Sequence, residues 1–154
     1  MRIEERLTEL GIDIPTAAAP VANYVPFVVT GGLVSVSGQV PIKAGKIAFV
    51  GKVNAEVSVE DACAAARLCA LNIVAQLKAA CDGDLNRVKR IVKLGGFVNC
   101  TDGFGGQPQI INAASDLMVD IFGDAGRHSR SAVGVNALPL NVPVEIDALV
   151  EIQS

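Results

Sequence analysis

The sequence is poor in aromatic residues: Phe, Tyr and Trp make up 4% of its 154 residues, and there is no Trp. Nucleic-acid-binding proteins stack bases on aromatic rings and gather Lys and Arg into basic patches. Here the formal net charge is −3 and the pI is near 5.1. We therefore predict that nucleic acid is not a partner.

Cysteine and histidine are too sparse and too scattered for a metal site. The four cysteines show no C-x-x-C spacing, and His128 is the only histidine. A structural zinc site takes four such ligands, and a catalytic one takes three. We therefore predict no metal, no cofactor and no disulfide, with four free thiols: Cys63, Cys69, Cys81 and Cys100.

Charged residues are also few, at 19%, against 51% apolar residues and a mean hydropathy of +0.43. The longest apolar stretch, residues 62–80, is broken by Arg67, Asn72 and Gln76, so we predict no membrane span. The N-terminal MRIEERLTELG is amphipathic and charged and does not resemble a signal peptide. We therefore predict a cytoplasmic location. The excess of apolar residues suggests a homo-oligomer.

Local patterns predict three helices and several strands. Residues 3–10 read as a helix stopped by Gly11, a second helix runs from the Ser58 cap to residue 80 or 81, and a third runs from Pro108 to Gly123. Strands are expected on both sides of Gly31-Gly32 and over residues 47–53 and 88–100, the last interrupted by Gly95-Gly96. Residues 127–152 read as a final hairpin. We predict one α+β domain over residues 1–154, a mixed sheet with two helices packed on one face.

Two familiar catalytic motifs are missing. The glycine-rich TDGFGGQP (residues 101–108) lacks the Gly-Lys-Ser/Thr ending of a phosphate-binding loop, and it also lacks the G-x-G-x-x-G spacing of a dinucleotide-binding loop. No G-x-S-x-G accompanies His128, which argues against a serine hydrolase. These patterns favour a flexible connection for the loop, and for His128 a loop histidine that is hydrogen-bonded to the backbone or to a neighbouring subunit.

Arg130 is a better candidate for a binding residue. Strand alternation places Arg130, Ala132 and Gly134 on one face, which leaves space beside the guanidinium. A fixed fork of donors over small residues can hold a carboxylate through two hydrogen bonds. An exposed arginine in a surface ion pair is the alternative.

Glu145 lies on the alternating strand VPVEIDALVEI, on the face opposite its valines and isoleucines. Its acidic neighbours could simply form a solvated face. In a hairpin that pairs Ala137 with Val142, Arg130 and Glu145 lie about 13 Å apart along the ladder. A small molecule, or a second subunit, could fill that gap.

Two motifs give a stronger indication. VSVSGQVP (residues 34–41) and RSAVGVNALPLNVPVEIDA (residues 130–148) resemble the signatures of the YjgF-type reactive intermediate deaminase family, which is RidA-like and also labelled L-PSP endoribonuclease. The resemblance covers nearly the whole chain and is weakest over the first twenty residues. It implies a chorismate-mutase-like fold, a homotrimer with sites between subunits, and hydrolysis of imines or enamines from pyridoxal-phosphate enzymes to 2-keto acids and ammonia.

The resemblance also implies roles for individual residues. Arg130 would bind the substrate carboxylate and Glu145 would handle water, with neither metal nor cofactor. Substrate-binding positions fall on Tyr24, Ser37 and Asn112, and adjacency suggests that His128 shapes the rim of the site.

The chain departs from the family pattern at three places. Ala132 stands where family deaminases commonly have Cys, a His-Ser pair precedes Arg130, and the chain carries a longer N-terminus and a glycine-rich loop at residues 103–106. These differences indicate a side branch. Two functions are alternatives to deamination. One is a non-catalytic trimer that binds a small carboxylate, and the other is an endoribonuclease, which the acidic pI disfavours.

Overall fold

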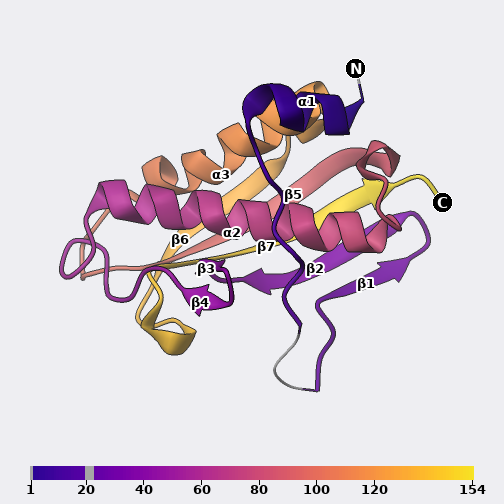
Figure 1. The fold of residues 1–154 in the computed structure, drawn as a ribbon. Helices are drawn as coiled ribbons and strands as arrows, with labels where there is room; N and C mark the ends of the chain where they lie inside the picture. Colours follow the sequence, from indigo (N-terminus) through magenta and orange to yellow (C-terminus); the bar gives the residue numbers. More distant parts are fainter. Residues whose placement is uncertain (1, 20–22) are drawn as a thin grey trace.

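The computed structural model describes residues 2–19 and 23–154 (Figure 1). Those ranges contain three α-helices, seven β-strands and three short 3-10 helices. In chain order they are α1 (Ile3–Leu10), β1 (Phe27–Thr30), β2 (Leu33–Gln39), β3 (Ile42–Lys43), β4 (Lys46–Ile47), α2 (Val59–Ala80), η1 (Leu85–Arg87), β5 (Val88–Asn99), α3 (Gln107–Phe122), η2 (Gly123–Gly126), β6 (Ser129–Val135), η3 (Pro139–Asn141) and β7 (Val144–Ile152).

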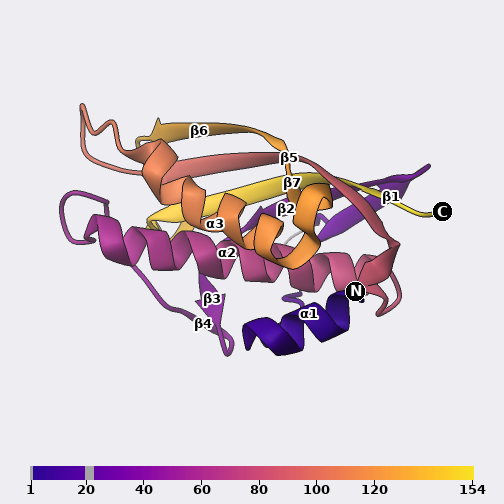
Figure 2. The same ribbon diagram turned by 90° about the horizontal axis from the view of Figure 1, so that it is seen from above.

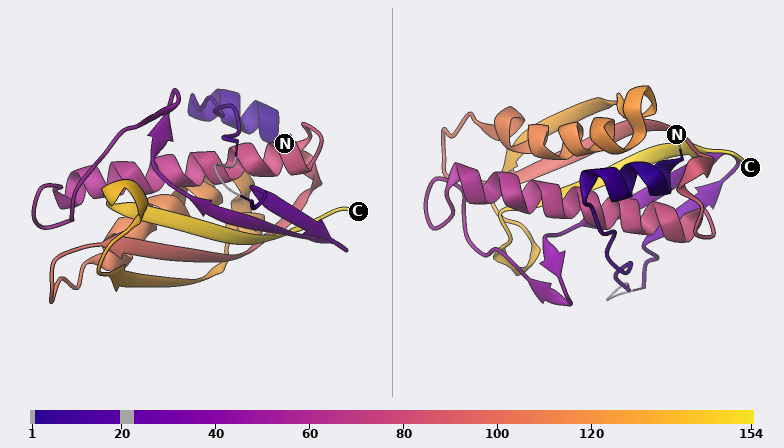
Figure 3. Two further views of the ribbon diagram at one scale, coloured as in Figure 1. Left: turned by 90° about the horizontal axis from the view of Figure 1, so that it is seen from below. Right: turned by 45° about the horizontal axis from the view of Figure 1, so that its top comes forward.

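Five strands form one sheet in the order β1-β2-β7-β5-β6, in which only the β5–β6 pair is parallel. Seen from above, α2 and α3 lie together on one side of this sheet, and α1 lies farther out on the same side (Figure 2). The other face carries no helix in the described parts of the chain (Figure 3). The predicted α+β fold is therefore confirmed.

Local signals fix the ends of the helices as the sequence predicts. Gly11 closes α1 in the left-handed conformation, with φ of 68°. The Ser58 hydroxyl accepts a hydrogen bond from the Asp61 amide at 3.1 Å and caps α2. By length and composition α2 could cross a membrane, but half of its side chains are buried in this fold. It is the core helix of the domain.

The predicted hairpin of residues 127–152 is wrong. Both of its strands form, but β5 lies between them. The β6 strand is parallel to β5, whereas β7 is antiparallel to both of its neighbours, β5 and β2. The reason is that β5, with twelve residues, is an interior strand with two edges to satisfy, and β6 and β7 each pair with one of them. The 13 Å ladder distance inferred from that hairpin does not apply.

Two smaller predictions also need correction. A strand over residues 47–53 is reduced to β4, which pairs only with β3, and an isolated bridge at Val53. Gly95 and Gly96 do not interrupt β5; its irregularities fall earlier, between Val88 and Lys93. Both glycines face bulky neighbours instead, because a side chain at Gly96 would overlap Ile111 of α3.

Candidate functional site

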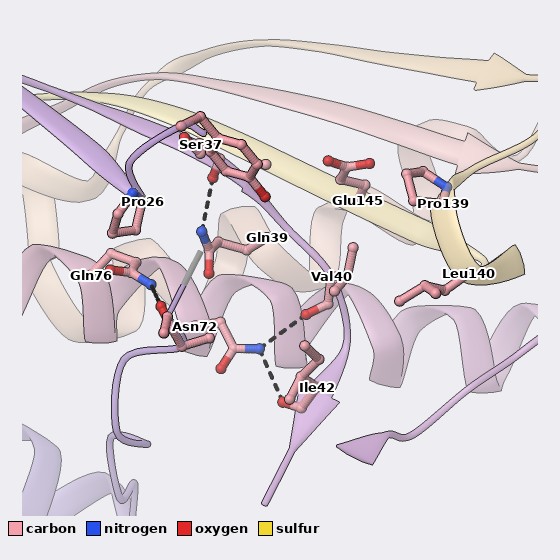
Figure 4. A pocket seen from close by; sticks show the side chains of 14 residues that line it. Pro26, Ser37, Gln39, Val40, Ile42, Asn72, Gln76, Pro139, Leu140 and Glu145 are labelled. Carbon is pink, nitrogen blue, oxygen red and sulfur yellow. Dashed lines mark hydrogen bonds between the residues drawn. The ribbon is translucent and has the colours of Figure 1, made fainter. Parts of the chain in front are cut away.

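A cavity of about 180 Å³ lies where β2, β7 and α2 meet the N-terminal segment and the turn after β6. It brings together three of the residues that the sequence analysis selected: Tyr24, Ser37 and Glu145. Figure 4 shows Pro139 and Leu140 on one side of Glu145, and Ser37 and Gln39 on the other. Among the described residues, those that line the cavity include no Lys, Arg or His.

Buried amides, which the sequence analysis missed, shape the cavity wall. Gln39 donates to the Ser37 carbonyl at 2.9 Å, and Asn72 donates to the carbonyls of Val40 and Ile42 at 3.0 Å. Gln76 donates to the Ala18 carbonyl at 3.0 Å (Figure 4). These bonds tie the SGQVP segment and the N-terminal segment to α2.

Glu145 supplies the carboxyl group of this cavity. It lies between Val144 and Ile146, which are buried toward the helices, so its own side chain points to the open face of the sheet. Burial, and then the charge of Asp147, raises the pKa of Glu145. Its carboxyl rests directly over Gly38, where no side chain could fit without moving it. The site therefore holds a carboxyl suited to taking up a proton.

Arg130 belongs to a second group of residues, on the helix side of the sheet. Its guanidinium donates to the Ser115 hydroxyl at 3.1 Å and to the Pro108 carbonyl at 3.3 Å, both on α3. The Ser115 hydroxyl also lies 2.8 Å from Nε2 of His128. The predicted shared face of Arg130 and Gly134 is confirmed, because a side chain at Gly134 would also meet α3, at Gln107.

The predicted site residues thus fall into two separate groups within one chain. Arg130 is level with Ala148 across β5, and Glu145 lies three residues farther along β7 on the opposite face. Asn112 is exposed on α3, outside the lining of the cavity. Ser115, which joins Arg130 to His128, gave no signal in the sequence, since it is one polar residue in an amphipathic helix.

A network of hydrogen bonds around the buried Asn99 supports the turn that borders the cavity. Nζ of Lys52 donates to Asn99 Oδ1 at 2.8 Å and also to the carbonyls of Cys100 and Asn136. Asn99 in turn donates to Asn141 Oδ1 at 3.2 Å. Leu140 and Asn141 both have positive φ, 58° and 54°, which side chains rarely adopt unless neighbours hold them there.

Comparisons with known proteins all indicate the same family. The family described as "YjgF/chorismate_mutase-like, putative endoribonuclease" matches residues 4–152. "Protein TCP17" of Trypanosoma cruzi is 47% identical over 154 residues, which cover 99% of this chain and 96% of that protein. The family match and this relative each span almost the whole chain.

Two solved structures place the chain within that group. The protein Atu1372 from Agrobacterium tumefaciens is 52% identical, with a TM-score of 0.91, and the match covers 98% of this chain and 92% of that one. E. coli TdcF with bound serine is 28% identical, with a TM-score of 0.62, and the match covers 90% and 94% of the two chains. In sequence and shape the chain is nearer to Atu1372 than to TdcF.

Proposed function

Because the chain belongs to the YjgF/chorismate-mutase-like family, we propose that it hydrolyses small 2-imino acids, and the enamines that give rise to them, to 2-keto acids and ammonia. One observation carries this proposal: in the part of the chain that the structure describes, the Glu145 carboxyl, with its raised pKa, is the only ionisable group besides Tyr24 that lines the cavity. A carboxyl whose pKa lies nearer neutrality is a better general base and general acid in turn.

The chemistry needs only this carboxyl and water. The substrate reacts as the iminium, C=NH2⁺, and Glu145 takes a proton from water while the oxygen forms a bond to the iminium carbon, which gives a neutral tetrahedral amino alcohol. Glu145 then returns its proton to the nitrogen of the tetrahedral intermediate. The C–N bond breaks and ammonia leaves, while the hydroxyl proton passes to the Glu145 carboxylate and the carbonyl of the 2-keto acid forms; ammonia then takes that proton in solution.

The carboxylate of the substrate needs a cation that the cavity lining does not supply. Arg130 could supply it, but within one chain it lies on the other face of the sheet. We therefore place the Arg130 of one copy against the Glu145 cavity of a second copy, in a homotrimer. The exposure of Val28 (50%), Leu33 (39%) and Val133 (44%) on the open face supports such an assembly.

Binding without catalysis is the second candidate function. The solved TdcF structure holds serine, a small amino acid with a carboxylate, which favours a small-carboxylate ligand here as well. Catalysis requires the Glu145 carboxyl, whereas simple binding tolerates an amide of the same shape. The net charge of −3 argues against RNA as the substrate, despite the endoribonuclease label of the family.

The proposal also concerns where the substrate comes from. Enamines and imines of amino acids are released by pyridoxal-phosphate enzymes and are short-lived in water. We therefore expect this protein to act in the cytoplasm, in the same compartment as such an enzyme.

The test couples this protein to a pyridoxal-phosphate enzyme that releases 2-aminoacrylate or 2-iminobutyrate and follows the formation of the keto acid. We expect wild type and the exposed-residue control Gln153→Ala to accelerate it, and Arg130→Ala and Glu145→Gln to lose the acceleration. If wild type accelerates neither reaction but binds the keto acids, the protein is a carboxylate-binding protein instead. If Glu145→Gln stays active, the role of Glu145 is wrong.

A further inference from the structure

Four groups form a continuous chain of hydrogen bonds that ends at Arg130. Nδ1 of His128 lies 2.6 Å from the Gly126 carbonyl oxygen, and its Nε2 lies 2.8 Å from the Ser115 hydroxyl. That hydroxyl accepts a hydrogen bond from Arg130 at 3.1 Å. The sequence analysis selected His128 and Arg130 but gave no account of how they interact.

The direction of every bond in this chain follows from its ends. A carbonyl oxygen can only accept, so Nδ1 of His128 must carry a proton. In the neutral ring Nε2 then has a lone pair, and it accepts the hydroxyl proton of Ser115. The oxygen of Ser115 is thereby left with its lone pairs toward Arg130. Only one tautomer of His128 fits this arrangement.

The Gly126 end of this chain of hydrogen bonds is fixed by close packing against α3. Gly126 is buried, and a side chain there would overlap the backbone of Met118 and Val119 in α3. The absence of a side chain lets η2 approach α3 closely. The Gly126 carbonyl and Ser115 are thus both anchored to the same helix, with His128 bridging them.

Arg130 keeps donors free for a ligand in this arrangement. An arginine side chain has five N–H donors, and the bonds to Ser115 and Pro108 use two of them, which leaves three. A guanidinium held at two corners loses little further entropy when it binds a carboxylate. An arginine without these contacts would have to be ordered by the ligand itself.

We propose that Ser115 and His128 are positioning residues, which hold Arg130 in the orientation that binds the substrate carboxylate. The proposal rests on the proposed function, because it assigns a ligand to Arg130. Neither residue touches the reacting atoms. Their loss therefore weakens binding and leaves the chemical step nearly unchanged.

The first experiment tests the hydrogen-bond chain without any ligand. Since His128 is the only histidine, the ¹⁵N NMR spectrum of labelled protein at about pH 8, where a typical histidine is neutral, shows a single imidazole ring. We expect the tautomer with the proton on Nδ1. The tautomer with the proton on Nε2 would overturn the proposal, because Ser115 could then not donate to the ring.

The second experiment tests what the chain of bonds does. We expect Ser115→Ala and His128→Leu to raise the Kd for 2-oxobutyrate and the KM for 2-iminobutyrate roughly tenfold, with kcat within twofold of wild type. Ser115→Thr keeps the hydroxyl and should restore both constants. Ser58→Ala removes a capping hydroxyl that accepts from the Asp61 amide and is not part of the Arg130 hydrogen-bond chain, so it controls for a general loss of stability.

The outcomes separate this inference from the proposed function. If wild type deaminates imines and Ser115→Ala has unchanged KM and Kd, the inference fails and the proposed function stands. If wild type binds 2-oxobutyrate without deaminating any imine, the proposed function fails, and the Kd values alone decide the inference. If Ser115→Thr behaves like Ser115→Ala, the hydroxyl is not what positions Arg130.

Discussion

Gly38 is the residue that most directly controls where the Glu145 carboxyl lies. It is in the irregular part of β2, between Val36 and Gln39, and the Glu145 side chain crosses directly over it. Its φ is outside the left-handed region, so the backbone would accept alanine. Gly38→Ala therefore adds one methyl group beneath the proposed catalytic carboxyl without changing any charge.

The size of the effect follows from the contact. A Cβ at Gly38 would lie 2.9 Å from Cδ of Glu145, whereas carbon atoms normally approach to about 3.5–4.0 Å. Oε2 of Glu145 would lie closer still, so the carboxyl must move by at least about 0.6–1.1 Å. Because a misplacement of about 1 Å can cost up to 100-fold in rate, we expect kcat to fall by about 10- to 100-fold. That loss corresponds to about 1.4–2.7 kcal/mol in the activation barrier.

The stability of the fold should change little, because the end of a flexible side chain gives way rather than the backbone. The matched control is Gly95→Ala, which places a methyl group against the carboxyl of Asp147 in the same manner, with Cγ at 3.2 Å. The assay is kcat for 2-iminobutyrate, with thermal unfolding measured on both variants. Gly38→Ala with kcat within twofold of wild type would refute the role given to Glu145.

Three further predictions concern charge and packing. Burial and Asp147 raise the pKa of Glu145, so in Asp147→Asn the acid limb of the kcat profile should move to lower pH. A raised pKa means that the charged Glu145 destabilises the folded state, so at pH values above this pKa Glu145→Gln should unfold at a higher temperature than wild type. The difference between the two unfolding temperatures should shrink as the pH falls through the pKa of Glu145. Lys52→Met leaves the buried Asn99 oxygen without its donor and should cost about 1.5–3 kcal/mol in the free energy of unfolding, measured by urea, whereas the exposed Lys46→Met should cost little.

The sequence predicts the helices well because local residues determine where they start and stop. Gly11, Ser58 and Gly123 each act within one helical turn, and each stands where the structure ends or begins a helix. The hairpin around Gly31-Gly32 is equally local, and Thr30 pairs with Leu33 as expected. These elements need no knowledge of the rest of the chain.

The strand order could not be predicted in this way. The pattern of residues 127–152 fits a hairpin, but the pairing is decided by β5, which lies earlier in the chain and takes the position between β6 and β7. Likewise the bond between Ser115 and His128 forms only when η2 folds back on α3. The motifs identified Glu145 and Arg130, but only the structure reveals that they lie on opposite faces of the sheet.

The central claim is that one site uses Arg130 from one copy and Glu145 from another. Arg130→Ala and Glu145→Gln, each inactive alone, should regain activity when their subunits are unfolded together and refolded at equal amounts. In a closed ring of copies, random mixing gives about one site in four with both residues intact, so about a quarter of the wild-type activity should return. Activity no higher than that of the separate variants, in mixed oligomers of wild-type size, would contradict the two-copy site.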